Sequence, residues 1–174
     1  MEHQIRKKQP NTKKCFVCGI KNVWGIRAGF YETDTKEVIS LFTPTTEHQS
    51  YPGRLHGGIA SAILDETIGR AILIGKENAI WGVTVEMTVK YRKPIPLHQQ
   101  IRVIGRIVKE NNRFFEGTGE IILPSGEIAV TAHGRYLKIP IDKIADFADD
   151  DFEWQVNHSE SDPASISIRL LKDK

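Results

Sequence analysis

The sequence predicts an α+β protein in which a curled antiparallel sheet of five to six strands wraps around one long central helix. The first observation is a helical stretch from Ile59 to Ile74 whose apolar residues cover more than one face. The second is a set of strand patterns on either side of this stretch, separated by turn-forming residues. A helix that is apolar on most sides needs protein around it, so we expect the sheet to curl over it.

The strands are identified by alternation of apolar and polar residues. Alternation is clearest from Val83 to Tyr91, where the odd-numbered residues are apolar and the even-numbered ones are polar, and Pro94 marks its end. Before the helix, a polar turn at residues 33–36 indicates a hairpin. The predicted strands, in chain order, are residues 25–32, 37–42, 83–91, 100–109, 113–123 and 127–138.

Length and composition indicate one globular domain. The chain has 174 residues, 40% of them hydrophobic, and a net charge of +2, which is ordinary for a protein with its own core. No apolar run reaches the roughly 18 residues of a membrane span, and residues 1–14 lack the apolar segment of a secretory signal. We therefore expect a cytoplasmic protein with no membrane partner, and two cysteines are too few for a disulfide framework.

Charge is concentrated at the two ends of the chain. Residues 1–14 carry five Lys/Arg against one Glu, whereas residues 142–174 carry nine Asp/Glu against four Lys/Arg. We expect a basic N-terminal arm at 1–14, the folded domain at 15–141 and an acidic C-terminal extension at 142–174, with both ends solvated. The basic arm lacks interleaved aromatic residues, so no nucleic-acid partner is expected.

The start of the predicted helix combines groups that acyl-transfer chemistry needs. Gly57 and Gly58 lie where the helix begins, so their backbone N–H groups are expected to be unpaired at the positive end of the helix dipole. His56 precedes them, and Asp65 and Glu66 interrupt the apolar run at its centre. Acidic residues are rarely buried unless something satisfies them. An oxyanion-binding helix end followed by a carboxylate predicts an acyl-transfer site.

The spacing of these groups predicts a dimer. Gly58 and Asp65 are about 10 Å apart along the helix axis at 1.5 Å per residue. One carbonyl group cannot easily reach both within a single helix. Two antiparallel copies of the helix would bring the glycine end of one copy against the carboxylate of the other, so a symmetric dimer is expected to complete the site.

The segment HGGIASAILDE, with its acid nine positions after the histidine, resembles the signature of hotdog-fold acyl-CoA thioesterases of the PaaI-like, phenylacetate-pathway group. HQSYPGRLHGG and VTVEMTVKYRKPIP also resemble that group, and the resemblance runs from about Cys15 to Ile139. It implies a hotdog fold, hydrolysis of an acyl-CoA thioester, and a dimer or a dimer of dimers with sites at the subunit interface. It implies no cofactor beyond the CoA that belongs to the substrate.

The resemblance also implies roles for individual residues. Asp65 would be a general base that activates water, or a nucleophile that forms a transient anhydride. The N–H of Gly57, alone or with that of Gly58, would polarise the thioester carbonyl, and His56 would order the loop. Thr84 matches a Ser/Thr that helps to bind the nucleophilic water. Because Thr84 lies on the polar side of its strand, it faces its own helix only if a bulge intervenes; otherwise it serves the partner's site.

Further candidates are less specific. Glu66 is the alternative carboxylate, because the rotation of the helix decides which of the two acids faces the site. Many related thioesterases have an asparagine or glutamine in the loop before the helix to orient water or the thioester, and Gln49 and Ser50 are the nearest candidates here. The basic residues expected to bind the CoA phosphates are Arg54, Lys90, Arg92 and Lys93.

Cys15 and Cys18 form a CxxC, which is half of a zinc site. No second CxxC and no HxxxH supplies the other half, so we expect a tight turn and no metal. The motifs of nucleotide binding, zinc proteolysis and serine hydrolysis are absent from the sequence. The rival hypothesis is a non-catalytic acyl-CoA-binding or regulatory hotdog protein. A carboxylate inside an apolar helix favours the enzyme, because a protein that only binds gains nothing from it.

Overall fold

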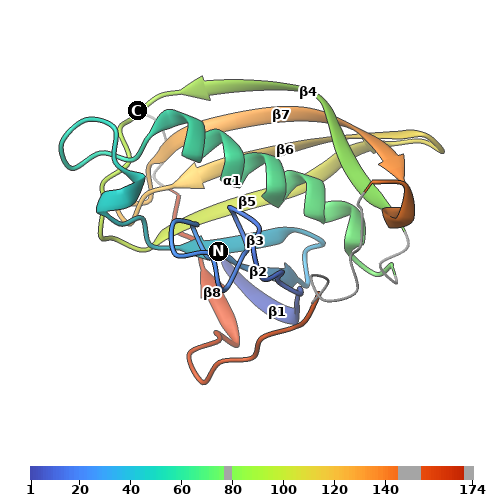
Figure 1. Cartoon of the computed structure of the whole chain (residues 1–174), viewed down its shortest axis with the longest axis horizontal. Helices are drawn as coiled ribbons and strands as arrows, with labels where there is room; N and C mark the ends of the chain where they lie inside the picture. Colours follow the sequence, from blue (N-terminus) through green and yellow to red (C-terminus); the bar gives the residue numbers. More distant parts are fainter. Residues whose placement is uncertain (77–79, 145–153, 171–174) are drawn as a thin grey trace.

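One helix crosses a broad antiparallel sheet in the computed structural model of the chain, which describes residues 1–76, 80–144 and 154–170 (Figure 1). The described strands form a single eight-stranded sheet in the order β4-β7-β6-β5-β3-β2-β1-β8, and neighbouring strands are antiparallel. The helix, α1, spans Gly57–Arg70. The strands are β1 (Glu2–Lys8), β2 (Gly29–Thr33), β3 (Val38–Phe42), β4 (Trp81–Tyr91), β5 (Ile101–Glu110), β6 (Phe114–Ile122), β7 (Ile128–Ile139) and β8 (Ser165–Ser167). Short 3₁₀ helices occupy Thr46–His48, Ala71–Leu73 and Ile141–Lys143.

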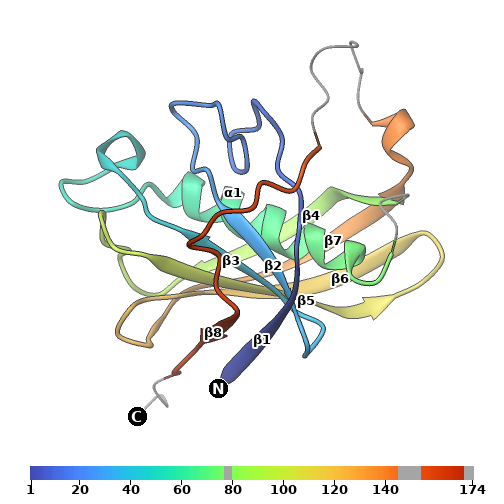
Figure 2. The same cartoon turned by 90° about the horizontal axis from the view of Figure 1, so that it is seen from below.

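The predicted α+β architecture is confirmed, and the six predicted strands are β2 to β7. Their ends shift little, except that β2 begins at Gly29 and not at residue 25. The residues before β2 pair with the CxxC loop instead: Ile26 N–H donates to Phe16 O at 2.8 Å, and Ala28 N–H donates to Val17 O at 2.9 Å. Figure 2 shows this loop above α1, on the face of the sheet that the helix covers.

The two charged ends add strands to the sheet, so the prediction that both are solvated extensions is wrong for β1 and β8. Ile5 of β1 pairs with Thr33 of β2, and Glu2 of β1 pairs with Ser167 of β8. Ile166 is buried in a second apolar cluster formed with side chains of β2, β3, β5 and β6. Apolar contacts and backbone pairing therefore hold these segments in spite of their charge. The most acidic stretch, residues 145–153, lies outside the described residues.

Helix α1 begins at Gly57, as predicted, but it ends at Arg70 and continues only as a 3₁₀ turn, before the predicted end at Ile74. Its buried side chains face the sheet, and its other side is half-buried. Among the described residues, no helix combines the length and apolar character that crossing a membrane requires.

Three glycines of the sheet allow α1 to pack very close to it. A Cβ at Gly105 would lie 2.7 Å from the carbonyl oxygen of Thr67, and one at Gly119 would lie 2.9 Å from Ile68 Cγ1. A Cβ at Gly117 would overlap Ile68 Cγ2. Any larger residue at these positions would push the helix away from β5 and β6.

Candidate active site

Asp65 lies in the middle of α1 and lines a cavity of about 300 Å³. Its Oδ1 accepts a hydrogen bond from Thr84 Oγ1 at 2.8 Å and from the Tyr136 hydroxyl at 3.1 Å. The Tyr136 ring is buried and stacks on Phe115, with the ring centroids 4.8 Å apart. Burial, together with the Asp65 carboxylate, raises the pKa of Tyr136, so the hydroxyl stays protonated and donates. Donors from β4 and β7 therefore fix the orientation of this carboxylate.

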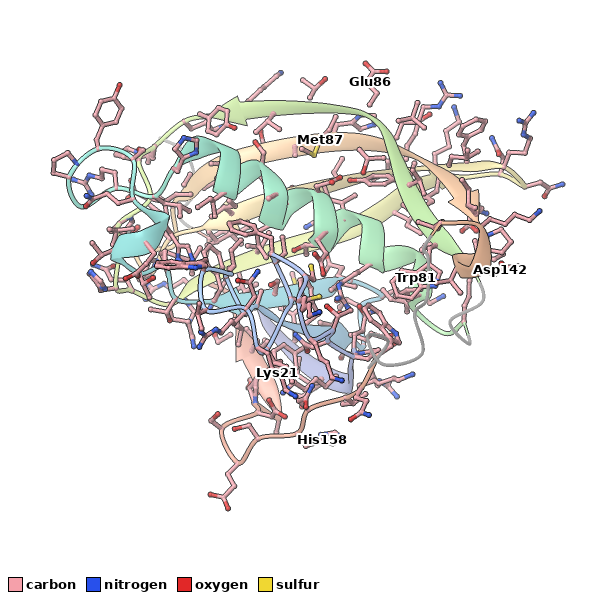
Figure 3. All side chains as sticks on the ribbon, in the orientation of Figure 1. Lys21, Trp81, Glu86, Met87, Asp142 and His158 are labelled. Atoms are coloured by element: carbon pink, nitrogen blue, oxygen red, sulfur yellow. The ribbon has the colours of Figure 1, made fainter. Side chains whose placement is uncertain are left out.

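A β-bulge explains how Thr84 reaches the helix. The pairing of β4 with β7 changes register between Thr84 and Glu86, and a bulge of one residue reverses the faces on which the following side chains lie. Figure 3 shows Met87 on the inner side of β4 and Glu86 on its outer side. Of the two possibilities that the sequence left open, the bulge is the one observed, and Thr84 contacts Asp65 of its own chain.

Glu66, the alternative carboxylate, is engaged with a different partner. Its Oε1 accepts hydrogen bonds from Arg70 Nε at 2.9 Å and from Arg70 Nη2 at 2.7 Å. The Arg70 side chain is only 3% exposed, and a buried cation needs a counter-charge. Glu66 therefore has a structural partner of its own, whereas Asp65 faces hydroxyl donors in the cavity. This difference favours Asp65 as the reacting carboxylate.

The N-terminus of α1 differs from the prediction in one respect. The N–H of Gly58 is not unpaired, because it donates to Nδ1 of His56 at 2.9 Å. His56 is the N-cap of the helix, which agrees with its predicted role of ordering the loop. The N–H of Gly57 makes no hydrogen bond to the residues that the structure describes. Of the two glycine N–H groups, only that of Gly57 is therefore free, among the described residues, to donate to a ligand.

Gly57 lines a second cavity, of about 380 Å³, which is open to solvent and carries basic residues at its rim. Arg54, Arg92 and Lys93 line this cavity, so the fold brings three of the four predicted phosphate-binding residues to the glycine end of the helix. Lys93 also pairs with Glu127.

Of the three other residues predicted to contact the ligand, only one lines this cavity. Lys90 is exposed on β4 and does not line this cavity. Ser50 lines it, whereas Gln49 Oε1 accepts a hydrogen bond from Gly53 N–H at 2.7 Å. Gln49 therefore braces the turn before the helix, and Ser50 is better placed to meet a ligand.

The two cavities share no lining residue. Gly57 and Asp65 are eight residues apart on α1, about 12 Å along the axis at 1.5 Å per residue. A single chain therefore brings Asp65, Thr84 and Tyr136 together at one place and Gly57 with the basic residues at another.

Sequence reasoning placed only Asp65, Glu66 and Thr84 at the site and missed the other residues of this cavity wall, among them Tyr136 and the two cysteines. Tyr136 was indistinguishable from a core residue, because it lies on the apolar face of a strand. Cys15 and Cys18 also line the cavity. A hydrogen bond from Cys18, opposed by burial, lowers the pKa of Cys15 to about 7. The sulfur atoms of both cysteines and a carboxylate oxygen of Glu66 lie within 4.8 Å of one another. Since the two segments are far apart in sequence, only the fold reveals this cluster.

Comparison with known protein families shows a similarity over the segment that holds the candidate site. Residues 52–130 match the model of the thioesterase superfamily, and these residues contain α1, β4 and the whole Gly57 to Thr84 segment. This stretch is therefore similar to the thioesterase superfamily, and the fold is the hotdog fold, as the resemblance of the sequence predicted.

Several relatives bear acyl-CoA thioesterase names. Mouse acyl-coenzyme A thioesterase THEM4 is 33% identical over 86 residues, which are 49% of this chain and 36% of the mouse protein. Human acyl-coenzyme A thioesterase 13 is 30% identical over 74 residues, which are 42% of this chain and 52% of the human protein. The match thus spans only part of each relative.

Solved structures agree on the fold. A thioesterase superfamily protein superposes with a TM-score of 0.65 at 24% identity, over 71% of this chain and 59% of its own. The PaaI protein of E. coli, from the phenylacetic acid degradation operon, superposes with a TM-score of 0.59 at 13% identity, over 66% of this chain and 80% of its own. A Streptococcus mutans protein bound to acetyl CoA superposes with a TM-score of 0.54 at 18% identity, over 60% of this chain and 82% of its own.

Proposed function

We propose that this chain is an acyl-CoA thioesterase, which hydrolyses a thioester to a free acid and CoA. The observation that carries the proposal is the Asp65 carboxylate, held in a cavity by Thr84 and Tyr136 in the middle of a largely apolar helix. The acyl-CoA thioesterase names of the two relatives and the acetyl CoA bound to one structural neighbour support the same substrate class.

Thioester hydrolysis requires few catalytic groups. A thiol with a pKa of about 8.5 is a good leaving group, so a positioned carboxylate and one oxyanion donor suffice. Asp65 removes a proton from the attacking water, or attacks the carbonyl itself and forms an anhydride that water then cleaves. In either case the N–H of Gly57 stabilises the negative charge that develops on the carbonyl oxygen.

We propose further that two chains form each site. The separation of about 12 Å between Gly57 and Asp65 on one helix exceeds what one thioester carbonyl and one water bridge with hydrogen bonds of about 3 Å. Strand β4 is the outermost strand on its side of the described sheet, so its free edge is available to a second copy. Pairing of two copies about a two-fold axis would place Gly57 of one chain against Asp65 and Thr84 of the other. A dimer of dimers would contain the same pair.

The CoA moiety then lies on the chain that supplies Gly57. Arg54, Arg92 and Lys93 line the cavity beside that glycine, where they offer cations to the phosphates. The acyl group points away from them, across the interface, toward the cavity that holds Asp65.

The experiment that tests this function is a thiol-release assay with a panel of acyl-CoAs that differ in chain length and aromaticity. We expect turnover of at least one member, and loss of that turnover in Asp65→Asn. Measurable binding of several acyl-CoAs without turnover of any would favour the alternative, a non-catalytic acyl-CoA-binding or regulatory hotdog protein.

A further inference from the structure

The CxxC loop and helix α1 place three metal-ligating side chains together beside the Asp65 cavity. The sulfur atoms of Cys15 and Cys18 and a carboxylate oxygen of Glu66 lie within 4.8 Å of one another, and Cys15 Sγ is 3.4 Å from Glu66 Oε2. We propose that these three residues bind one zinc-class divalent ion. The sequence predicted no metal because it offered two ligands; the fold supplies the third.

The loop is shaped to present both sulfur atoms on one side. The backbone N–H groups of Val17 and Cys18 donate to Cys15 Sγ at 3.3 and 3.4 Å, which stabilises the thiolate form that ligates metals. Gly19 N–H donates to Cys15 O at 2.9 Å. A Cβ at Gly19 would overlap the backbone of Cys15, so this tight closure requires glycine.

The third ligand is already oriented by Arg70. The two hydrogen bonds that the guanidinium donates to Glu66 both go to Oε1, and the other oxygen, Oε2, faces Cys15. Arg70 is itself fixed, because its Nη1 donates to Pro10 O at 2.9 Å and its guanidinium packs against the rings of Phe30 and Trp154. Outer residues that orient a ligand in this way are typical of protein metal sites.

Charge balance favours a divalent ion. Two thiolates and the Glu66 carboxylate would carry three negative charges, and Arg70 carries one positive charge. A divalent cation makes the cluster neutral, which matters because Cys18 and Arg70 are buried. Thiolate sulfur together with a carboxylate oxygen suits Zn²⁺ better than Ca²⁺ or Mg²⁺, which prefer oxygen ligands alone.

Three protein ligands leave one tetrahedral position for water. Asp65 and Trp154 line the same cavity as the three ligands. The indole Nε1 of Trp154 is buried and has no hydrogen-bond partner among the described residues. Its N–H is therefore available to donate a hydrogen bond to a water in this cavity. The ion would join the loop of residues 12–19 to α1 one residue away from Asp65, and thereby hold the wall of that cavity in place.

The test is the metal content of the full chain, purified from zinc-supplemented medium with any affinity tag removed. Elemental analysis should give about one zinc per chain, as three ligands of a single site require. Replacement of the zinc by Co²⁺ should give the absorption of thiolate-to-cobalt charge transfer. Cys15→Ser should lower zinc affinity by more than about tenfold, because loss of an outer-shell partner alone costs about 10- to 100-fold.

Two carboxylate variants provide the matched comparison. Glu66→Gln should lose zinc, whereas Asp65→Asn, one residue away, should keep it. Each variant is compared by circular dichroism, and Cys15→Ser serves as the ligand variant if Glu66→Gln does not fold. Zinc far below one per chain, with both cysteines titrating as free thiols or joined in a disulfide, would overturn the proposal. Loss of zinc in Asp65→Asn but not in Glu66→Gln would overturn the ligand set. Neither result bears on thioester hydrolysis, which the thiol-release assay measures separately.

Discussion

Asp65→Asn and Gly57→Val chains, each nearly inactive alone, should regain activity when they are combined in one dimer. Loss of a general base lowers turnover by about 100-fold or more. Valine at Gly57 should block the approach of the thioester to the helix N-terminus, although a Cβ there meets only the Tyr91 ring at 3.4 Å, so the fold itself should tolerate the change.

The size of the recovery follows from the geometry. The two groups are about 12 Å apart on one helix, so in the proposed dimer each site takes Gly57 from one chain and Asp65 from the other. A heterodimer then has one site with both lesions and one intact site. Random pairing of equal amounts makes half of the dimers hetero, so turnover should reach about a quarter of the wild-type value. If one chain supplied both groups, no dimer would hold an intact site.

The assay mixes the two variants, denatures and refolds them together, and measures thiol release from the best acyl-CoA of the panel. The control is wild-type chain refolded with Asp65→Asn, which keeps half of the sites in either model and so reports the refolding yield. Differently tagged chains allow the heterodimer to be isolated. A heterodimer no more active than its parents would refute the shared site.

Three further predictions concern single variants. Asp65→Asn should lower kcat by about 100-fold or more with an unchanged unfolding midpoint; a normal kcat would remove Asp65 from the mechanism. Tyr136→Phe keeps the buried ring but removes a donor to the carboxylate. Since a hydrogen bond to a charged group contributes about 1.5–3 kcal/mol, kcat should fall by about 10- to 150-fold. A kcat equal to that of the wild type would show that Thr84 alone orients Asp65. In zinc-free protein, Glu66→Gln should lower the free energy of unfolding by about 1–3 kcal/mol in urea, because buried Arg70 loses its charged partner. It should affect kcat far less than Asp65→Asn, and the opposite ranking would exchange the roles of the two acids.

The helix and the central strands could be predicted because their patterns are local. A period of two runs through β4, and the apolar residues of α1 recur at helical spacing. β1 and β8 have no such signal: β1 reads EHQIRKK and is mostly charged or polar, and β8 is three residues long. Their stability comes from pairing across nearly the whole chain, Glu2 with Ser167, which no local window can show.

The candidate site was predictable in part for the same reason. Asp65 was identifiable, because an acid within an apolar helix conflicts with its surroundings. Thr84 was ambiguous, because a bulge reverses the face of a strand without leaving a clear mark in the sequence. The contact of Cys15 with Glu66 joins two segments that only the fold brings together.

The glycines at 105, 117 and 119 restrict where an acyl chain can lie. Because backbone and Ile68 atoms already fill the space between α1 and the sheet, no tunnel can open beneath the helix without lifting it and displacing Asp65. Room for a longer acyl group must come from the side of the helix that the sheet leaves half-buried. Variants that alter chain-length preference should therefore be sought on that exposed side and on the opposing subunit of the proposed dimer. Enlarging the core under the helix would cost stability without admitting a longer substrate.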